Sequence, residues 1–189
     1  MAKDIVLLES VDHVEFAVRD LQAASSLYDK AGFMCVGKRH EVNRHSRLYV
    51  QGEVRIILSS SDEPGDPVCQ FVRTHGDGVI NLGFCVPNAR EAIDLACSKG
   101  AKKAFGLETL RGINSGGQER AAISVFGSVR NVFIKYQDKS KLIDFFPEDA
   151  KPVDKKGKWV QIIDHITVNL EKGQLNRWAD FYQDVFGFT

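Results

Sequence analysis

The sequence predicts an α+β fold of paired β-α-β-β-β modules, in which one curved mixed sheet carries its helices on the outside. Residues 11–33 read VDHVEFAVRDLQAASSLYDKAGF, an apolar strand followed by an amphipathic helix that Gly-Phe closes. Residues 163–188, IDHITVNLEKGQLNRWADFYQDVFGF, repeat that unit. A shift of 68 residues also places Phe16 on Phe84 and Val18 on Val86. Since one such unit cannot bury its sheet alone, we expect the modules to pair.

The first module is predicted from its periodicity and its caps. Residues 11–18 alternate apolar and polar side chains, as a half-buried strand does. Asp20 is a suitable N-cap for the following helix, and Gly32 can end it in the left-handed conformation. Three strands are then expected over residues 33–38, 48–51 and 54–59, the last two joined by a tight turn at Gly52.

The second module repeats this order. Residues 79–86 predict a strand, Asn88 with Glu91 resembles a capping box, and Gly100 closes the helix. Strands are expected over residues 103–107, 120–126 and 131–136. We therefore expect a first domain at residues 1–137, with modules at about 11–61 and 79–137.

The remaining sequence divides into two segments. Residues 138–158 are rich in charge and proline and predict an exposed linker, in which four apolar residues should dock on a neighbouring surface: Leu142, Ile143, Phe145 and Phe146. Residues 159–189 are expected to hold the first strand and helix of a truncated catalytic domain. The apolar face of that helix (Leu175, Trp178, Tyr182 and Val185) would be exposed unless a partner covers it.

Composition excludes several classes of protein. The 25 basic and 25 acidic residues cancel, which argues against nucleic acid or an anionic membrane as the main partner. The apolar run at residues 5–8 is too short for a signal peptide or a membrane span, so we expect a cytoplasmic protein. Its four cysteines form no CxxC pair and are expected to be small buried hydrophobes in a reducing compartment.

The repeat itself tests the first domain for a metal site. In such paired modules, a histidine on the first strand and a carboxylate on the last strand of each module would bind metal on the concave side. His13 fills the first position, but Asn81 stands at the corresponding place, and neither last strand has Asp or Glu. We therefore expect a structural first domain. His13 is either a satisfied histidine paired with Asp12 or a weak metal ligand.

The other histidines have different interpretations. His75 is a turn residue bonded to backbone or, alternatively, an inter-domain contact, while His40 and His45 are expected to be solvated. His165 repeats the position of His13 in a module whose remainder is absent from the sequence.

Three segments carry a family resemblance. THGDGVINLGFCVPNAREAIDLACSKGA, IIDHITVN and WADFYQDVFGF resemble 4-hydroxyphenylpyruvate dioxygenase and its sister, 4-hydroxymandelate synthase, and the resemblance covers about residues 11–189. The module alone is typical of the wider vicinal oxygen chelate superfamily, with its glyoxalase-like fold.

The resemblance implies an enzyme with a metal-free N-terminal domain and a C-terminal domain that holds Fe(II) on two histidines and a glutamate. His165 would be the first metal ligand and Thr167 a substrate-binding residue, with the co-ligands beyond Thr189. The reaction would convert 4-hydroxyphenylpyruvate, a small aromatic 2-oxo acid, and O2 to homogentisate and CO2 in tyrosine and phenylalanine catabolism. No other catalytic residue is assigned.

We expect the 189-residue chain alone to be incomplete and inactive, and to act as a homo-oligomer or with a missing C-terminal half. The alternatives are the sister synthase and a metal-free binding module for a small aromatic ligand or a partner subunit. A homodimer sharing a site between His13 and His165 is a weaker option, because no suitably placed carboxylate supports it.

Overall fold

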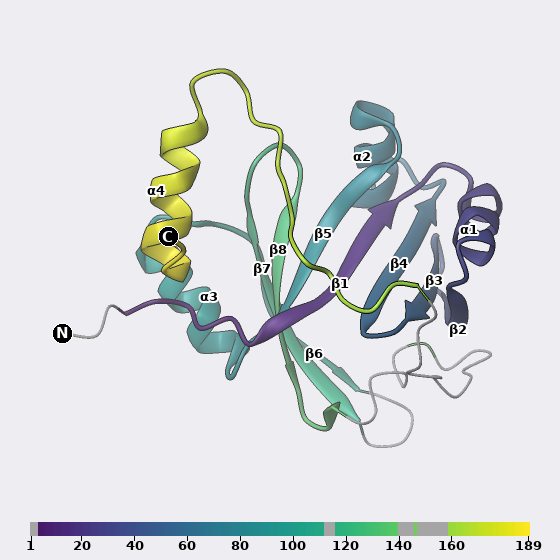
Figure 1. Ribbon diagram of the computed structural model, residues 1–189, viewed down its shortest axis with the longest axis horizontal. Helices are drawn as coiled ribbons and strands as arrows, with labels where there is room; N and C mark the ends of the chain where they lie inside the picture. Colours follow the sequence, from purple (N-terminus) through teal and green to yellow (C-terminus); the bar gives the residue numbers. More distant parts are fainter. Residues whose placement is uncertain (1–3, 112–115, 140–145, 147–158) are drawn as a thin grey trace.

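The computed structural model describes residues 4–111, 116–139, 146 and 159–189, and shows one curled eight-stranded sheet with helices outside (Figure 1). The elements in chain order are β1 (Ser10–Ala17), α1 (Leu21–Lys30), β2 (Met34–His40), β3 (Arg44–Gln51), β4 (Val54–Ser61), α2 (Pro67–His75), β5 (Gly78–Cys85), α3 (Ala89–Ser98), β6 (Lys102–Arg111), β7 (Gly117–Ser124), β8 (Arg130–Tyr136) and α4 (Leu175–Phe186).

The strand order confirms the paired modules. It runs β2-β3-β4-β1-β5-β8-β7-β6, with β1 antiparallel to β5 at the centre. Each first strand is parallel to the last strand of its own module, β1 to β4 and β5 to β8. The 68-residue shift relates both ends of β1 to those of β5, and both ends of α1 to those of α3. The mixed sheet of an α+β fold is thereby confirmed.

The predicted helix ends are confirmed by their hydrogen bonds. The Asp20 carboxylate accepts from two backbone N–H groups of α1, and the Asn88 side chain does the same for α3. Asn88 also donates to the Glu91 carboxylate at 2.8 Å. Gly32 has φ +82°, a conformation that side chains with a Cβ rarely adopt.

Helix α2 was not predicted from the sequence. Asp66 caps it by accepting from Val68 N, and Pro67 occupies the first turn, where its missing N–H costs nothing. The Asp-Pro pair was the available signal. The helix packs Val68, Phe71 and Val72 against Ala17 and Ile80 and so covers one end of the central strands.

The outer faces of the two modules are covered differently. Helix α1 packs on the first module, whereas α3 and α4 share one apolar cluster over the second (Figure 1). Val185 and Phe186 of α4 are buried there, and Val6 N donates to Val185 O at 2.8 Å. The expectation that this helix would expose its aromatic face was therefore wrong, since the second module covers much of it. Of the four apolar residues named for this face, Leu175 in the first turn is the one that is largely exposed.

The expected strand after Trp159 is not formed. Glu53 N donates to Gln161 O beside the β3–β4 turn, and residues 162–170 then run to α4 without strand pairing. Both sides of β1 are already occupied, by β4 and β5, so the central sheet offers no free edge there. A strand without a partner cannot satisfy its backbone groups, which accounts for the irregular conformation.

Of the four linker residues expected to dock, the structure describes Phe146, and this prediction is confirmed. Its side chain is 4% exposed and packs among Val36 and Leu48. Leu142, Ile143 and Phe145 lie outside the described residues. In the described part of the chain, no helix has the length and apolar character needed to cross a membrane.

Candidate functional site

His13 belongs to a buried polar network centred on Asp12. His13 Nδ1 donates to Asp12 Oδ2 at 2.7 Å, Arg55 Nη1 donates to Asp12 Oδ1 at 2.7 Å, and the Tyr136 hydroxyl donates to Oδ2 at 3.1 Å. Burial alone raises the pKa of Asp12, but the His13 hydrogen bond and the nearby charges outweigh it and hold the pKa below 3.8. The interpretation of His13 as a satisfied histidine paired with Asp12 is confirmed.

Gly83 fixes the position of the His13 ring. A Cβ added at this glycine would lie 2.5 Å from two ring atoms, so the imidazole occupies the space that any other residue would fill. The close approach of β1 and β5 therefore holds the ring in one place.

A second buried carboxylate, Glu15, lies two residues further along β1. Ser59 Oγ donates to Glu15 Oε1 at 2.7 Å, and Asn81 Nδ2 donates to Oε2 at 2.6 Å. Burial alone raises the pKa of Glu15, yet these hydrogen bonds and neighbouring positive charges keep it below 4.5. Glu15 was missed because carboxylates were sought on β4 and β8, the last strands of the two modules.

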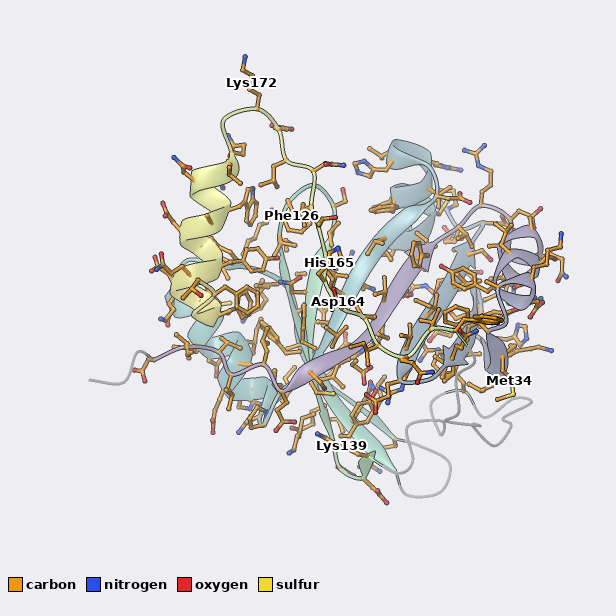
Figure 2. The ribbon with its side chains drawn as sticks, viewed as in Figure 1. Met34, Phe126, Lys139, Asp164, His165 and Lys172 are labelled. Carbon is orange, nitrogen blue, oxygen red and sulfur yellow. The ribbon has the colours of Figure 1, made fainter. Side chains whose placement is uncertain are left out.

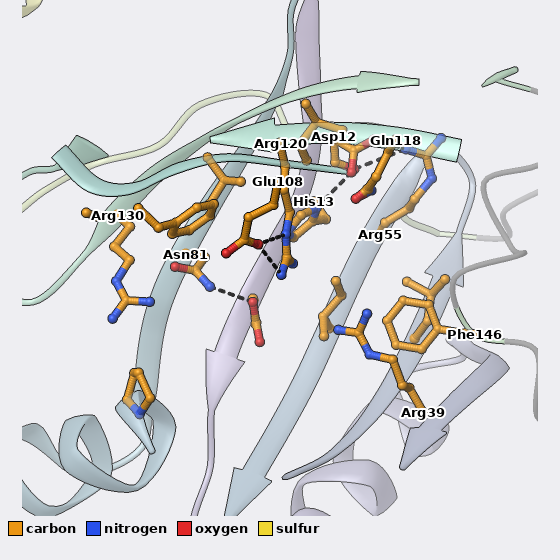
Figure 3. Close-up of a pocket in the computed structure, with 18 of the residues that line it drawn as sticks. Asp12, His13, Arg39, Arg55, Asn81, Glu108, Gln118, Arg120, Arg130 and Phe146 are labelled. Carbon is orange, nitrogen blue, oxygen red and sulfur yellow. Dashed lines mark hydrogen bonds and ion pairs between the residues drawn. The ribbon is translucent and has the colours of Figure 1, made fainter. Parts of the chain in front are cut away.

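Asp12, His13 and Glu15 line a cavity of about 340 Å³ between the modules (Figure 3). Its walls combine apolar side chains such as Ile57 and Val132 with five arginines, Arg39, Arg44, Arg55, Arg120 and Arg130. The third carboxylate in the lining is Glu108, which pairs with Arg120 at 2.9 Å. Pairing of the two modules thus gathers charges that are far apart in the sequence.

The side chains of the charged cavity do not form a set of metal ligands. Asn81, which stands where the second module would need its histidine, donates to Glu15 instead. Within the residues that the structure describes, no group of three or more His, Cys, Asp or Glu side chains is placed to hold a metal ion.

Glu15→Gln is expected to make the free energy of unfolding depend less on pH below about pH 5. Because the folded pKa of Glu15 is lowered, the ionised carboxylate stabilises the fold above the ordinary pKa of 4.5, and this contribution disappears as pH falls through the folded value. The variant should lose about 1–3 kcal/mol at pH 7 and less near pH 3. Urea titrations at both pH values measure this, with exposed Glu53→Gln as control. An equal loss at both values would contradict the expectation.

His165 lies apart from this cavity, on the irregular segment before α4 (Figure 2). Its Nδ1 donates to Asp164 Oδ2 at 2.9 Å, and the side chains of His165 and Asp164 are 74% and 85% exposed. The pair repeats the Asp12–His13 hydrogen bond. A carboxylate on Nδ1 leaves Nε2 available as a ligand, which is the usual arrangement of metal-binding histidines. Thr167 is also exposed.

The remaining predicted histidines are placed clearly. His75 ends α2 and contacts the Ser128 hydroxyl of the second module at 2.9 Å, a side-chain contact rather than the predicted bond to turn backbone. His40 and His45 are exposed as expected, but they face each other across β2 and β3 with their Nδ1 atoms 2.7 Å apart.

The cysteines are all free. Cys69 and Cys85 are buried as predicted, whereas Cys35 and Cys97 are only partly so. Burial raises the pKa of the Cys85 thiol, which disfavours a reactive thiolate.

In each module the first strand is parallel to the last, and the two modules join through the antiparallel β1–β5 pair. This arrangement defines a protein of the vicinal oxygen chelate superfamily, with its glyoxalase-like fold. Residues 4–145 match the family model described as "Hydroxyphenylpyruvate dioxygenase, HPPD, N-terminal". The chain therefore belongs to the hydroxyphenylpyruvate dioxygenase family.

Individual relatives agree with this assignment. MelA of Shewanella colwelliana is 28% identical over 188 residues, covering 96% of this chain and 50% of MelA. The 4-hydroxyphenylpyruvate dioxygenase of Pseudomonas sp. (strain P.J. 874) is 29% identical over 192 residues, covering 96% of this chain and 49% of the relative. A mutant 4-hydroxymandelate synthase from Streptomyces coelicolor superposes with a TM-score of 0.78 at 25% identity, over 95% of this chain and 53% of that one. The chain spans about half the length of these curated relatives.

Proposed function

We propose that this chain is the N-terminal part of an Fe(II)-dependent dioxygenase that converts 4-hydroxyphenylpyruvate and O2 to homogentisate and CO2. The observation that carries the proposal is the match of residues 4–145 to the N-terminal region of this family. The relatives of Legionella pneumophila and Pseudomonas that bear the dioxygenase name support it. Cytoplasmic location and function in tyrosine catabolism are part of the proposal.

The proposed domain division is the one expected from the sequence, with α4 of the second segment docked on the first domain. Residues 1–137 form the metal-free domain, residues 138–158 a linker, and residues 159–189 the start of the catalytic domain. Residues 162–168 expose Ile162, Ile166 and Val168, in a segment with no strand partner. A further sheet from the C-terminal half would supply that partner, or a homo-oligomer would cover the surface.

His165 is the proposed first ligand of Fe(II), through Nε2. Asp164 would orient the ring by accepting the hydrogen bond from Nδ1, which leaves the Nε2 lone pair for the metal. Thr167 is two residues away; in a strand paired with a further sheet, side chains at this spacing would point to one side, so Thr167 would line the substrate pocket. Bound Fe(II) would supply open coordination positions for the 2-oxo acid and O2. The second histidine and the glutamate would come from beyond residue 189.

A fusion protein tests the proposal. Residues 1–189 would replace the matching half of the Pseudomonas sp. dioxygenase, and the fusion would receive Fe(II) and 4-hydroxyphenylpyruvate. We expect O2 consumption with formation of homogentisate, and no turnover by the 189-residue chain alone. A folded fusion that holds iron and leaves the substrate unchanged would contradict the proposal.

The sister synthase is the second candidate, because a 4-hydroxymandelate synthase superposes over 95% of this chain. The same fusion assay, with its C-terminal half taken from the Streptomyces synthase, would report whether this N-terminal half supports hydroxymandelate formation as well. Support for only one of the two reactions would assign the chain to that enzyme.

A further inference from the structure

The cavity between the two modules is separate from the proposed iron site. Its lining comes from residues 12–146, and the described residues after Phe146 do not contribute to it. A volume of about 340 Å³ suits a molecule with one ring, at the lower end of the range for small-molecule sites. A ligand in this cavity would therefore bind apart from the proposed iron site.

The charges around the cavity do not balance. Five arginines face three carboxylates, Asp12, Glu15 and Glu108. Asp12 already binds Arg55, and Glu108 already binds Arg120. Both carboxylate oxygens of Glu15 already accept hydrogen bonds, from Ser59 and Asn81. The lining alone thus has an excess of two positive charges, and the pairing of Arg44 with Asp66 behind it leaves an excess of one.

Arg39 and Arg130 carry that excess. The Nε atom of Arg39 is buried without a hydrogen-bond partner among the described residues, and its carboxylate contact, to Glu41, is long at 3.5 Å. Arg130 has no ion pair within the described part of the chain, whereas Arg44 pairs with Asp66 outside the cavity wall at 2.8 Å. Burial lowers the pKa of Arg39 and of Arg130, although the negative charge of Glu15 acts in the opposite direction on both.

Apolar side chains complete the site. The Arg39 guanidinium lies over the Phe146 ring at 5.0 Å, and that of Arg120 lies over Phe105 at 5.5 Å. Stacking on a ring leaves the edge of a guanidinium available to bind a planar carboxylate. Leu48 and Val132 line the same cavity and would contact the body of a ligand.

We infer that this cavity binds a small organic acid, with its carboxylate on Arg39 beside the Phe146 ring and its apolar body between the two modules. Charge selects the carboxylate, and the apolar side chains of the lining distinguish an organic acid from an inorganic anion. The carboxylate balances one positive charge of the lining, and the ligand contacts residues of both modules. Its binding should therefore also stabilise the fold.

Calorimetric titration of the 189-residue protein with benzoate tests the inference. We expect a Kd of about 1 mM or tighter, and binding of the neutral isostere benzamide at least about tenfold weaker. Arg39→Gln should weaken benzoate binding by about tenfold or more, whereas Arg130→Gln, on the opposite side of the cavity (Figure 3), should weaken it less. Arg90→Gln, at an exposed position on α3, is the matched control and should not change it.

Three results would overturn the inference. The first is absence of benzoate binding, and the second is equal binding of benzoate and benzamide. The third is equal affinity for inorganic phosphate and benzoate, which would make the cavity a simple anion site. The comparison of benzoate, benzamide and phosphate needs only the unmodified protein, so the test stands even where an arginine variant does not fold. Activity of the fusion protein is a separate readout and can fail independently.

Discussion

Asp12→Ala is expected to lower the free energy of unfolding by about 3 kcal/mol. The carboxylate is buried and accepts hydrogen bonds from His13, Arg55 and Tyr136, so its removal leaves three polar groups without their partner. Breaking a buried ion pair from one side costs about 3–5 kcal/mol. The lower end applies because Arg55 keeps some contact with solvent. Urea denaturation at pH 7 measures the change.

The repeat provides the matched control for Asp12. Asp164→Ala removes the corresponding acid of the second Asp-His pair, whose two side chains are exposed. Exposed pairs contribute little, so this variant should change stability by less than about 0.5 kcal/mol. Similar losses in the two variants would mean that burial of the Asp12 network is not what stabilises it.

Phe186→Ala should cost about 3–5 kcal/mol, because it opens a cavity between α4 and the second module. The Phe186 side chain is 5% exposed and contacts the rings of Phe133 and Tyr182. The result would establish that α4 packs on the first domain as part of the same cooperative unit. Thermal and urea unfolding followed by circular dichroism give the difference.

Leu175→Ala is the control on the same helix, since its side chain is 68% exposed. It should change stability by no more than about 0.5 kcal/mol. If Phe186→Ala also cost less than about 1 kcal/mol, α4 would not be docked on the second module as described.

Periodicity and capping chemistry predicted most of the fold because these signals are local. Asp20, Asn88 and Gly32 act at the helix ends as their residue types require. The 68-residue shift holds for the first strand and helix of each module and then drifts, because the hairpins of the second module differ in length. Helix α2 was missed because its nine residues give a short periodic pattern that tertiary burial completes.

The cavity could not be predicted, because it depends on which strands become neighbours. His13 and Glu15 share one face of β1 by simple alternation, but Asp12 joins them through an irregularity in the β1–β5 register. Arg39 and Arg130 meet the same space from opposite modules. Sequence reasoning did identify the Asp-His pairs, since the repeat places one at residues 12–13 and another at 164–165.

Iron content of the fusion protein tests the central claim most directly, because His13 and His165 occupy equivalent positions of the repeat. We expect His13→Ala to retain about one Fe(II) per chain, since His13 serves the Asp12 network. His165→Ala should lose most of the iron, because it removes one of three proposed ligands. Retention of iron by a folded His165→Ala protein, or loss of iron only in His13→Ala, would contradict the account.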